Sequence, residues 1–114
     1  MKYDIYKGRK ILITGASSGI GFEFTKLLNA HECVLILVAL RFEQLENIKD
    51  NLSRQGMAKV YYLRADLSKV NDIEELYQTL KTKDLIPDIL INNAGVGLFG
   101  EFLKTLKETL IQIL

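Results

Sequence analysis

The eight residues from Thr14 to Gly21, Thr-Gly-Ala-Ser-Ser-Gly-Ile-Gly, have the types and spacing needed to bind a phosphate group. They follow the apolar run 11–13 and open a segment with helical spacing. The first N–H groups of a helix lack intrahelical partners, and the aligned peptide dipoles add positive charge there. Gly15 would let the chain turn off the strand, Gly19 would let the backbone approach a ligand, and Gly21 would let the helix pack closely. A pyrophosphate is therefore the ligand that this turn predicts.

The spacing of the glycines leaves other interpretations open. It is Gly-x-x-x-Gly-x-Gly rather than the Gly-x-Gly-x-x-Gly of the long-chain dinucleotide binders. No Gly-Lys-Ser or Gly-Lys-Thr follows the turn, which argues against a nucleoside triphosphate site. A glycine-rich turn without any ligand remains an alternative.

Composition places the chain among ordinary globular proteins. Its 114 residues suffice for one domain, residues 1–114, and 48% are apolar while 25% are charged. The formal net charge of +1 and the lack of an apolar run of bilayer length predict no nucleic-acid or membrane partner. The single Cys33 and the lack of a signal-peptide core favour the cytoplasm. His31 is expected in a surface or capping role, and no cluster has metal-ligand spacing.

Alternating strand and helix patterns predict the α/β class with a doubly wound parallel sheet. The predicted strands are 10–14, 34–40, 59–63 and 89–91, and the predicted helices are 20–29, 42–54, 70–82 (with Ser68 as N-cap) and 101–114. The expected inward residues are Ile20, Phe24, Leu27 and Leu28 in the first helix, and Leu103, Leu106, Leu110 and Ile113 in the last. The expected strand order, 3-2-1-4, leaves the fourth strand as an apolar edge.

Three further motifs fall at the carboxyl ends of the predicted strands, where ligands of such sheets bind. Arg41 follows the second strand, Asp66-Leu67 follows the third, and Asn92-Asn93-Ala94-Gly95 follows the fourth. With the glycine turn, in this order and spacing, they make essentially the whole chain resemble the N-terminal half of the short-chain dehydrogenase/reductase family. The resemblance implies a Rossmann-type, NAD(P)-binding domain.

The resemblance also implies roles for individual residues. Asp66 would accept a hydrogen bond from the adenine amino group, and the backbone of Leu67 would complete the contact with the ring edge. Asn92 would brace the sheet. The residues that would contact the pyrophosphate and the adenosine ribose are Gly15, Ser17, Ser18, Gly19, Ile20 and Gly21, together with Asn93, Ala94 and Gly95. Asp66 as a turn cap, and Asn92 and Asn93 as loop residues bonded to their own backbone, remain alternatives.

The end of the second strand predicts the form of the cofactor. NAD binders place an acidic residue there to bond the ribose 2′-hydroxyl, and Ala39-Leu40-Arg41 has none. The guanidinium of Arg41 suits a 2′-phosphate, which favours NADP(H) over NAD(H). The sequence departs from the Arg-Arg pair of many NADP-preferring members at Leu40, and the turn has Ser18 instead of a basic residue. A solvated Arg41 is the alternative.

The catalytic groups of the family are not found in this sequence. The family uses a serine and a Tyr-x-x-x-Lys pair for proton transfer. The two matches here, Tyr3/Lys7 before the first strand and Tyr77/Lys81 on the third helix, lie away from the carboxyl ends of the strands. We therefore expect no catalytic residue in this chain, which should be inactive alone.

The resemblance implies an enzyme that moves hydride between a nicotinamide and an alcohol or carbonyl substrate, with this chain as its cofactor-binding part. A homodimer through the helix that starts at Glu101 is a further implication. The alternative is a non-catalytic module that binds a dinucleotide or another protein.

Overall fold

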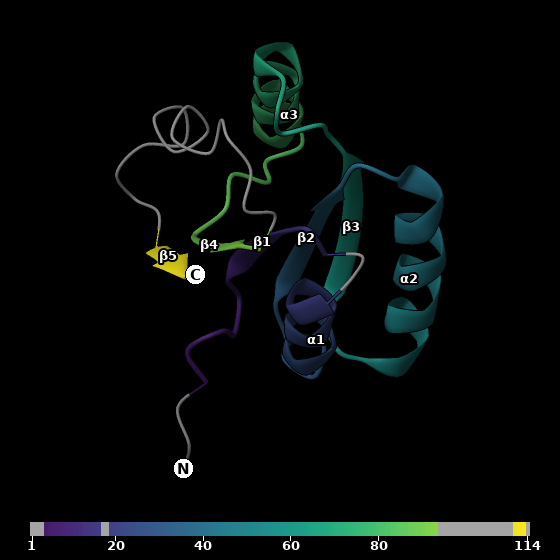
Figure 1. The fold of residues 1–114 in the computed structure, drawn as a ribbon. Coiled ribbons are helices and arrows are strands. Elements are labelled where there is room, and N and C mark those ends of the chain that lie inside the picture. The colour runs from purple at the N-terminus through teal and green to yellow at the C-terminus, as the bar shows by residue number, and fades with distance from the viewer. Residues whose placement is uncertain (1–3, 17–18, 94–110, 114) are drawn as a thin grey trace.

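The computed structural model describes residues 4–16, 19–93 and 111–113. Their strands form one parallel sheet in the order β3-β2-β1-β4-β5. The strands are β1 (Lys10–Thr14), β2 (Val34–Ala39), β3 (Lys59–Arg64), β4 (Ile89–Asn92) and β5 (Ile111–Ile113), and the helices are α1 (Gly19–Leu28), α2 (Phe42–Gln55) and α3 (Val70–Thr82). Figure 1 shows α3 on the opposite side of the sheet from α1 and α2.

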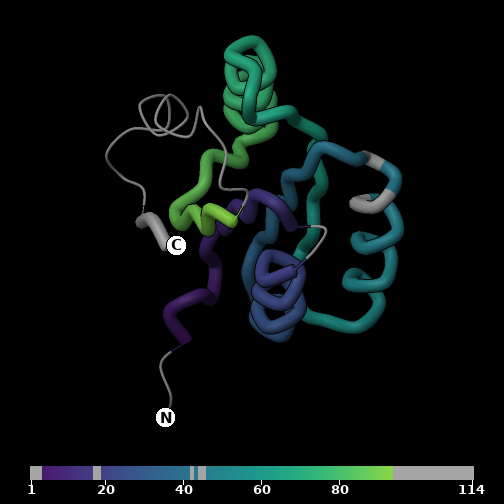
Figure 2. The backbone as a smooth tube through the Cα atoms, viewed as in Figure 1, coloured from purple at the N-terminus to yellow at the C-terminus, as the bar shows by residue number. Residues whose placement is uncertain are grey.

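The path of the chain confirms the doubly wound α/β class. The backbone in Figure 2 runs from β1 through α1 to β2, and through α2 to β3, before α3 returns it to the other side of β1. The first four strands therefore have the predicted order. Successive connections diverge between β1 and β4, and this is the point at which sheets of this kind bind ligands.

The two faces of the sheet have separate cores, because successive side chains of a strand point to opposite faces. Ile11 and Ile13 of β1 pack on the face covered by α1 and α2, whereas Leu12 packs on the face covered by α3. All three are fully buried. Burial on both faces explains the continuous apolar runs of β1 and β2, which are typical of a parallel sheet.

Two of the four expected inward residues of α1 are confirmed, since Leu28 is buried and Phe24 packs partly against the core, but the closest contact is made by Gly21. Gly21, Thr25 and Leu28 are buried, whereas Ile20 is 66% exposed and Leu27 is 69% exposed. A Cβ on Gly21 would overlap the Gly15 carbonyl oxygen and the side-chain nitrogen of Asn93. The helix axis therefore lies too close to β1 for a large side chain at the contact, and the contact face is centred on Gly21.

The end of the chain differs from the prediction. The predicted helix 101–114 is wrong for Ile111–Ile113, which form β5 and pair with Ile89–Ile91 of β4. Strand β4 is therefore an interior strand and not the edge of the sheet. A short apolar run rich in isoleucine is compatible with the hydrophobic period of a helix and with that of a strand, and β-branched side chains favour the strand. The rest of that predicted helix, and with it the predicted dimer surface, lies outside the described residues.

Near the amino ends of the strands, side-chain contacts join the segment before β1 to the loop between α1 and β2. His31 Nδ1 lies 2.8 Å from Asp4 Oδ2, and its ring meets the Tyr6 ring edge to face. The hydrogen bond with His31 lowers the pKa of Asp4.

Burial raises the pKa of the Cys33 thiol to about 11, so this thiol stays protonated at neutral pH. The Cys33 side chain is part of the core on the face covered by α1 and α2.

The contact at Gly21 generates a prediction about stability. Replacing a helical glycine by alanine in open space stabilises a protein by about 0.5–1 kcal/mol. At Gly21 the added methyl meets backbone and a hydrogen-bonded amide, so G21A should instead lower the free energy of unfolding by about 1–3 kcal/mol. Urea denaturation measures the difference. The control L27A, on the exposed side of the same helix, should change stability little, and a stabilised G21A would contradict the packing described.

Candidate functional site

The candidate site lies at the carboxyl end of the sheet. In the register of the strands, Thr14 at the end of β1 stands between Asn92 of β4 and Val38 of β2, and Ala39 stands beside Arg64 at the end of β3. Four strand ends with polar or glycine-rich continuations therefore meet at one edge.

Hydrogen bonds from Thr14 join the ends of β1 and β4. The Thr14 hydroxyl accepts the backbone N–H of Asn93 (3.0 Å) and donates toward Asn92 Oδ1 (3.1 Å). The Asn93 side-chain amide donates to the Gly15 carbonyl oxygen (3.2 Å). Asn92 thus braces the sheet as expected, and Asn93 bonds another strand's connection rather than its own backbone. The role of the Thr14 hydroxyl was not predicted; the available signal was a hydroxyl-bearing residue at the end of an apolar strand.

The turn from β1 to α1 needs glycine at two positions for conformational reasons. Gly15 has φ +63° and Gly19 has φ +59°, both in the left-handed region. The N–H of Ala16 donates to the Val38 carbonyl oxygen (3.4 Å), which ties the turn to the end of β2. Among the described residues, apart from the chain neighbours of Gly19 and its own helix backbone, no atom lies within 4 Å of the position that a Cβ would take there. The backbone at the start of α1 is therefore open to a ligand.

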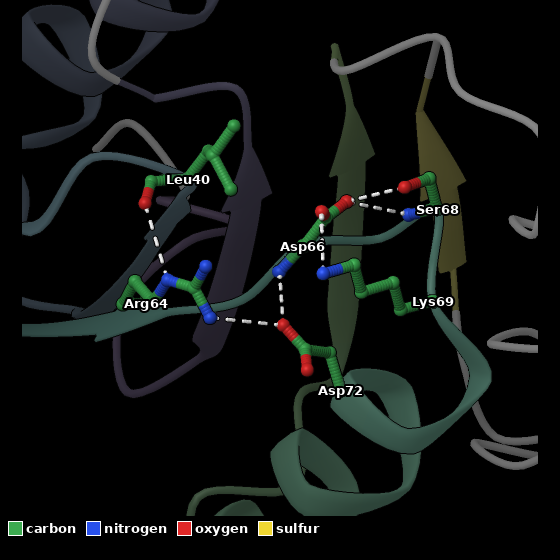
Figure 3. A network of polar contacts seen from close by, with 6 residues as sticks. All are labelled: Leu40, Arg64, Asp66, Ser68, Lys69 and Asp72. Atoms are coloured by element: carbon green, nitrogen blue, oxygen red, sulfur yellow. Dashed lines mark hydrogen bonds and ion pairs between the residues drawn. The ribbon is translucent and has the colours of Figure 1, made fainter.

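Asp66 follows β3 and holds its own turn. Its Oδ1 accepts the Ser68 hydroxyl (2.6 Å) and the Ser68 N–H (3.0 Å), and its Oδ2 lies 4.0 Å from Lys69 Nζ (Figure 3). The bonds from Ser68 lower the pKa of Asp66, so the group is a carboxylate at neutral pH. These hydrogen bonds are the ones expected if Asp66 caps the turn before α3. The predicted N-cap is wrong, because Lys69 holds that position of α3 while the Ser68 side chain bonds Asp66.

Arg64 and Asp72, which were not predicted as site residues, complete this corner. Asp72 Oδ2 accepts the backbone N–H of Asp66 (2.8 Å) and an Arg64 Nη1 bond (3.0 Å). The Nε of Arg64 donates to the Leu40 carbonyl oxygen (3.3 Å). Figure 3 shows this path from the end of β2, through Arg64 and Asp72, to Asp66. An acidic residue in the first turn of α3 was the available signal for Asp72.

The other predicted residues have the following places. Arg41 is exposed and occupies the N-cap position of α2, without a side-chain capping bond. Leu67 is buried against α3, and the exposed Ile20 lies in the first turn of α1. Tyr77 packs on the α3 core, away from the carboxyl edge, and Lys81 is exposed. The predicted contacts Ser17, Ser18, Ala94 and Gly95, and Tyr3, lie outside the described residues.

The described residues contain neither a membrane-spanning helix nor a cluster of metal-binding side chains. In residues 4–16, 19–93 and 111–113, no helix has the length and apolar character needed to cross a membrane. The same part of the chain has no group of three or more His, Cys, Asp or Glu residues that could hold a metal ion.

Comparison with known proteins identifies the family. Residues 9–114 match the family model described as short chain dehydrogenase. The chain is 34% identical over 93 residues to farnesol dehydrogenase of Aedes aegypti, and this match covers 82% of this chain and 38% of that protein. It is 40% identical over 95 residues to the NADP-dependent 3-hydroxy acid dehydrogenase of Schizosaccharomyces pombe, which covers 80% and 36%. The chain therefore belongs to the short-chain dehydrogenase family.

Solved structures agree with this assignment. The L-sorbose reductase of Gluconobacter frateurii, in a complex with NADPH and L-sorbose, superposes with a TM-score of 0.73 at 26% identity, over 80% of this chain and 35% of that one. A bulky-bulky ketone specific alcohol dehydrogenase from Comamonas testosteroni gives 0.68 at 31% identity, over 79% and 37%. The chain spans about a third of the length of the curated relatives that it matches. The share of the relative's length is between 30% and 38% for five of them, including the two named above.

The Thr14 network generates a second prediction. T14V keeps the shape of the side chain but leaves the Asn93 N–H without its acceptor, so the free energy of unfolding should fall by about 1–3 kcal/mol. Urea denaturation measures the loss. The control T82V, at the exposed end of α3, makes the same chemical change without this network. Equal stabilities of T14V and the control would show that the hydroxyl does not hold β4 to β1.

Proposed function

We propose that this chain is the NADP(H)-binding part of a short-chain oxidoreductase, with residues 1–114 forming a single dinucleotide-binding domain. The observation that carries the proposal is the open, left-handed Gly19 at the start of α1, at the point where the strand connections diverge. Family membership supports the same ligand class, since nicotinamide dinucleotides are the cofactors of the family.

The turn fits a pyrophosphate for reasons of space and charge. The helix α1 begins at Gly19, where its unpaired N–H groups and its dipole favour an anion. In the part of the chain that the structure describes, no side chain from outside this turn occupies the space over Gly19, and the Gly21 contact fixes the helix start relative to β1. Phosphate oxygens could thus approach the backbone directly.

The corner at Asp66 fits the adenine. Two Ser68 donors keep the Asp66 carboxylate ionised and oriented, and an ionised carboxylate accepts the hydrogen bond of an amino group well. Asp66 and Leu67 follow β3, next to the strand that ends before Arg41. The adenosine would then run across the ends of β2 and β3, with Asn93 and its neighbours beside the ribose.

Arg41 supports the preference for NADP(H). Its side chain is exposed at the start of α2, and no acidic residue stands in 39–41 to repel a 2′-phosphate. A guanidinium can bind a phosphate through two parallel hydrogen bonds. The names of two similar proteins, the S. pombe NADP-dependent dehydrogenase and the sorbose reductase with NADPH, agree with this preference.

The chemistry that the bound dinucleotide supplies is hydride transfer to or from an alcohol or carbonyl carbon. This chain's own residues would bind and orient the cofactor, and Thr14, Asn92 and Asn93 would hold the strand ends on which it lies. We assign no catalytic residue to the chain, and we expect the chain alone to bind dinucleotide without oxidising or reducing a substrate.

The role of Gly19 is tested with a matched pair of variants. G19V places a side chain over the start of α1 and should weaken NADPH binding at least about tenfold in titration calorimetry, because phosphate can no longer approach the backbone. G8V is the control, since Gly8 has φ +75° and equally open space but lies before the amino end of β1. Both carry the same backbone strain, so equal NADPH affinities of the two variants would remove the turn from the site.

Cofactor preference is tested at Arg41. R41A should weaken NADPH about tenfold, which corresponds to one charge-assisted hydrogen bond, and should change NADH binding less than about twofold. R54A removes the same charge at the other end of α2 and is the control. An equal effect of R41A on both nucleotides would show that Arg41 does not recognise the 2′-phosphate.

A further inference from the structure

The Arg64–Asp72 pair joins two parts of the chain that the proposed function uses separately. One end of the pair holds the Leu40 carbonyl, directly before Arg41, and the other end holds the backbone N–H of Asp66. Arg64 and Leu40 are 24 residues apart in the sequence, and Asp66 and Asp72 are 6 residues apart. Figure 3 shows the four groups in one continuous path across the ends of β2 and β3.

The guanidinium of Arg64 has the geometry that this bridge needs. Its Nε and Nη1 donate in different directions from one rigid plane, to Leu40 and to Asp72. The Asp72 side chain is 19% exposed and shares one oxygen, Oδ2, between Arg64 and Asp66. The guanidinium of Arg64 therefore fixes the position of the carboxylate oxygen that accepts the Asp66 N–H.

We infer that Asp72 and Arg64 are positioning residues, which hold the end of β2 and the Asp66–Leu67 segment at the separation that the adenosine half of the dinucleotide requires. The inference rests on the proposed function. Neither side chain needs to touch the cofactor. Asp72 directs the Asp66 backbone, Ser68 directs the Asp66 carboxylate, and Arg64 keeps the Leu40 peptide in register with both.

This role differs from that of a direct phosphate ligand, which the charge and 47% exposure of the Arg64 side chain could also suggest. A positioning pair acts on the adenosine, which NADPH and NADH share, so its loss should weaken both nucleotides by the same factor. A phosphate ligand would act on NADPH alone. A lysine at position 64 would still serve as a phosphate ligand. It would not serve as a positioning residue, because an ammonium cannot bind two partners in fixed directions as the planar guanidinium does.

The test measures NADPH and NADH affinities of the purified chain by titration calorimetry. D72A and R64K should each weaken both nucleotides about tenfold with an unchanged ratio, and D72N, which keeps an acceptor for the Asp66 N–H, should lose less. The double variant R64K/D72A should be no weaker than D72A alone, because the two residues act as one unit. The matched control is E75A, an acidic residue one turn further along α3 with an exposed side chain.

A second readout separates positioning from general instability. Hydrogen exchange of the Asp66 amide, measured without nucleotide, should accelerate in D72A and not in E75A, while amides of β1 keep their protection. Unchanged nucleotide affinity in D72A, or a loss confined to NADPH, would overturn the inference and leave the proposed function standing. Failure of the unsubstituted chain to bind either nucleotide would overturn the proposed function, and the inference with it.

Discussion

The architecture of the candidate site depends on the close contact between helix α1 and the end of β1 at Gly21. The missing Cβ allows the helix to reach the Gly15 carbonyl, and the amide of Asn93 bonds the same oxygen from β4. One carbonyl oxygen thus lies at the meeting point of a helix and two strands. The direction of α1, and hence the place toward which its first N–H groups point, follows from this contact.

The remaining polar groups of the site form a chain of local constraints. Thr14 fixes β4 against β1, and Ala16 ties the turn to β2. Across β3, Arg64 and Asp72 continue the connection to Asp66. Each of these bonds satisfies a backbone N–H or carbonyl group at or just beyond the end of a strand. The polar edge is therefore part of the folded framework.

Local patterns in the sequence predicted most of the fold. β1 and α3 have the predicted bounds because one is a short apolar run before glycine and the other has a regular stripe. Only part of the inward face of α1 could be predicted: Phe24 and Leu28 face the core as expected, but hydrophobicity ranks Ile20 and Leu27 above Gly21, whereas close packing favours the smallest side chain. For Ile111–Ile113, the pairing with β4 is a tertiary effect that overrides local propensity. Arg64 and Asp72 were missed because their bonds join segments that come together only in the folded chain.

The position of β3 at the outside of the sheet has a consequence for self-association. In the described sheet this strand has a hydrogen-bonded neighbour on one side only, β2. Its outer backbone groups could template the strand of another molecule, which is the usual route to edge-to-edge aggregation. β3 begins with Lys59 and ends with Arg64, both exposed, and the Lys59 ammonium lies 5.4 Å from the centre of the Tyr61 ring. A copy of β3 in parallel register would bring like charges together at both ends. The same arginine that bridges toward Asp66 therefore also discourages the addition of a second chain.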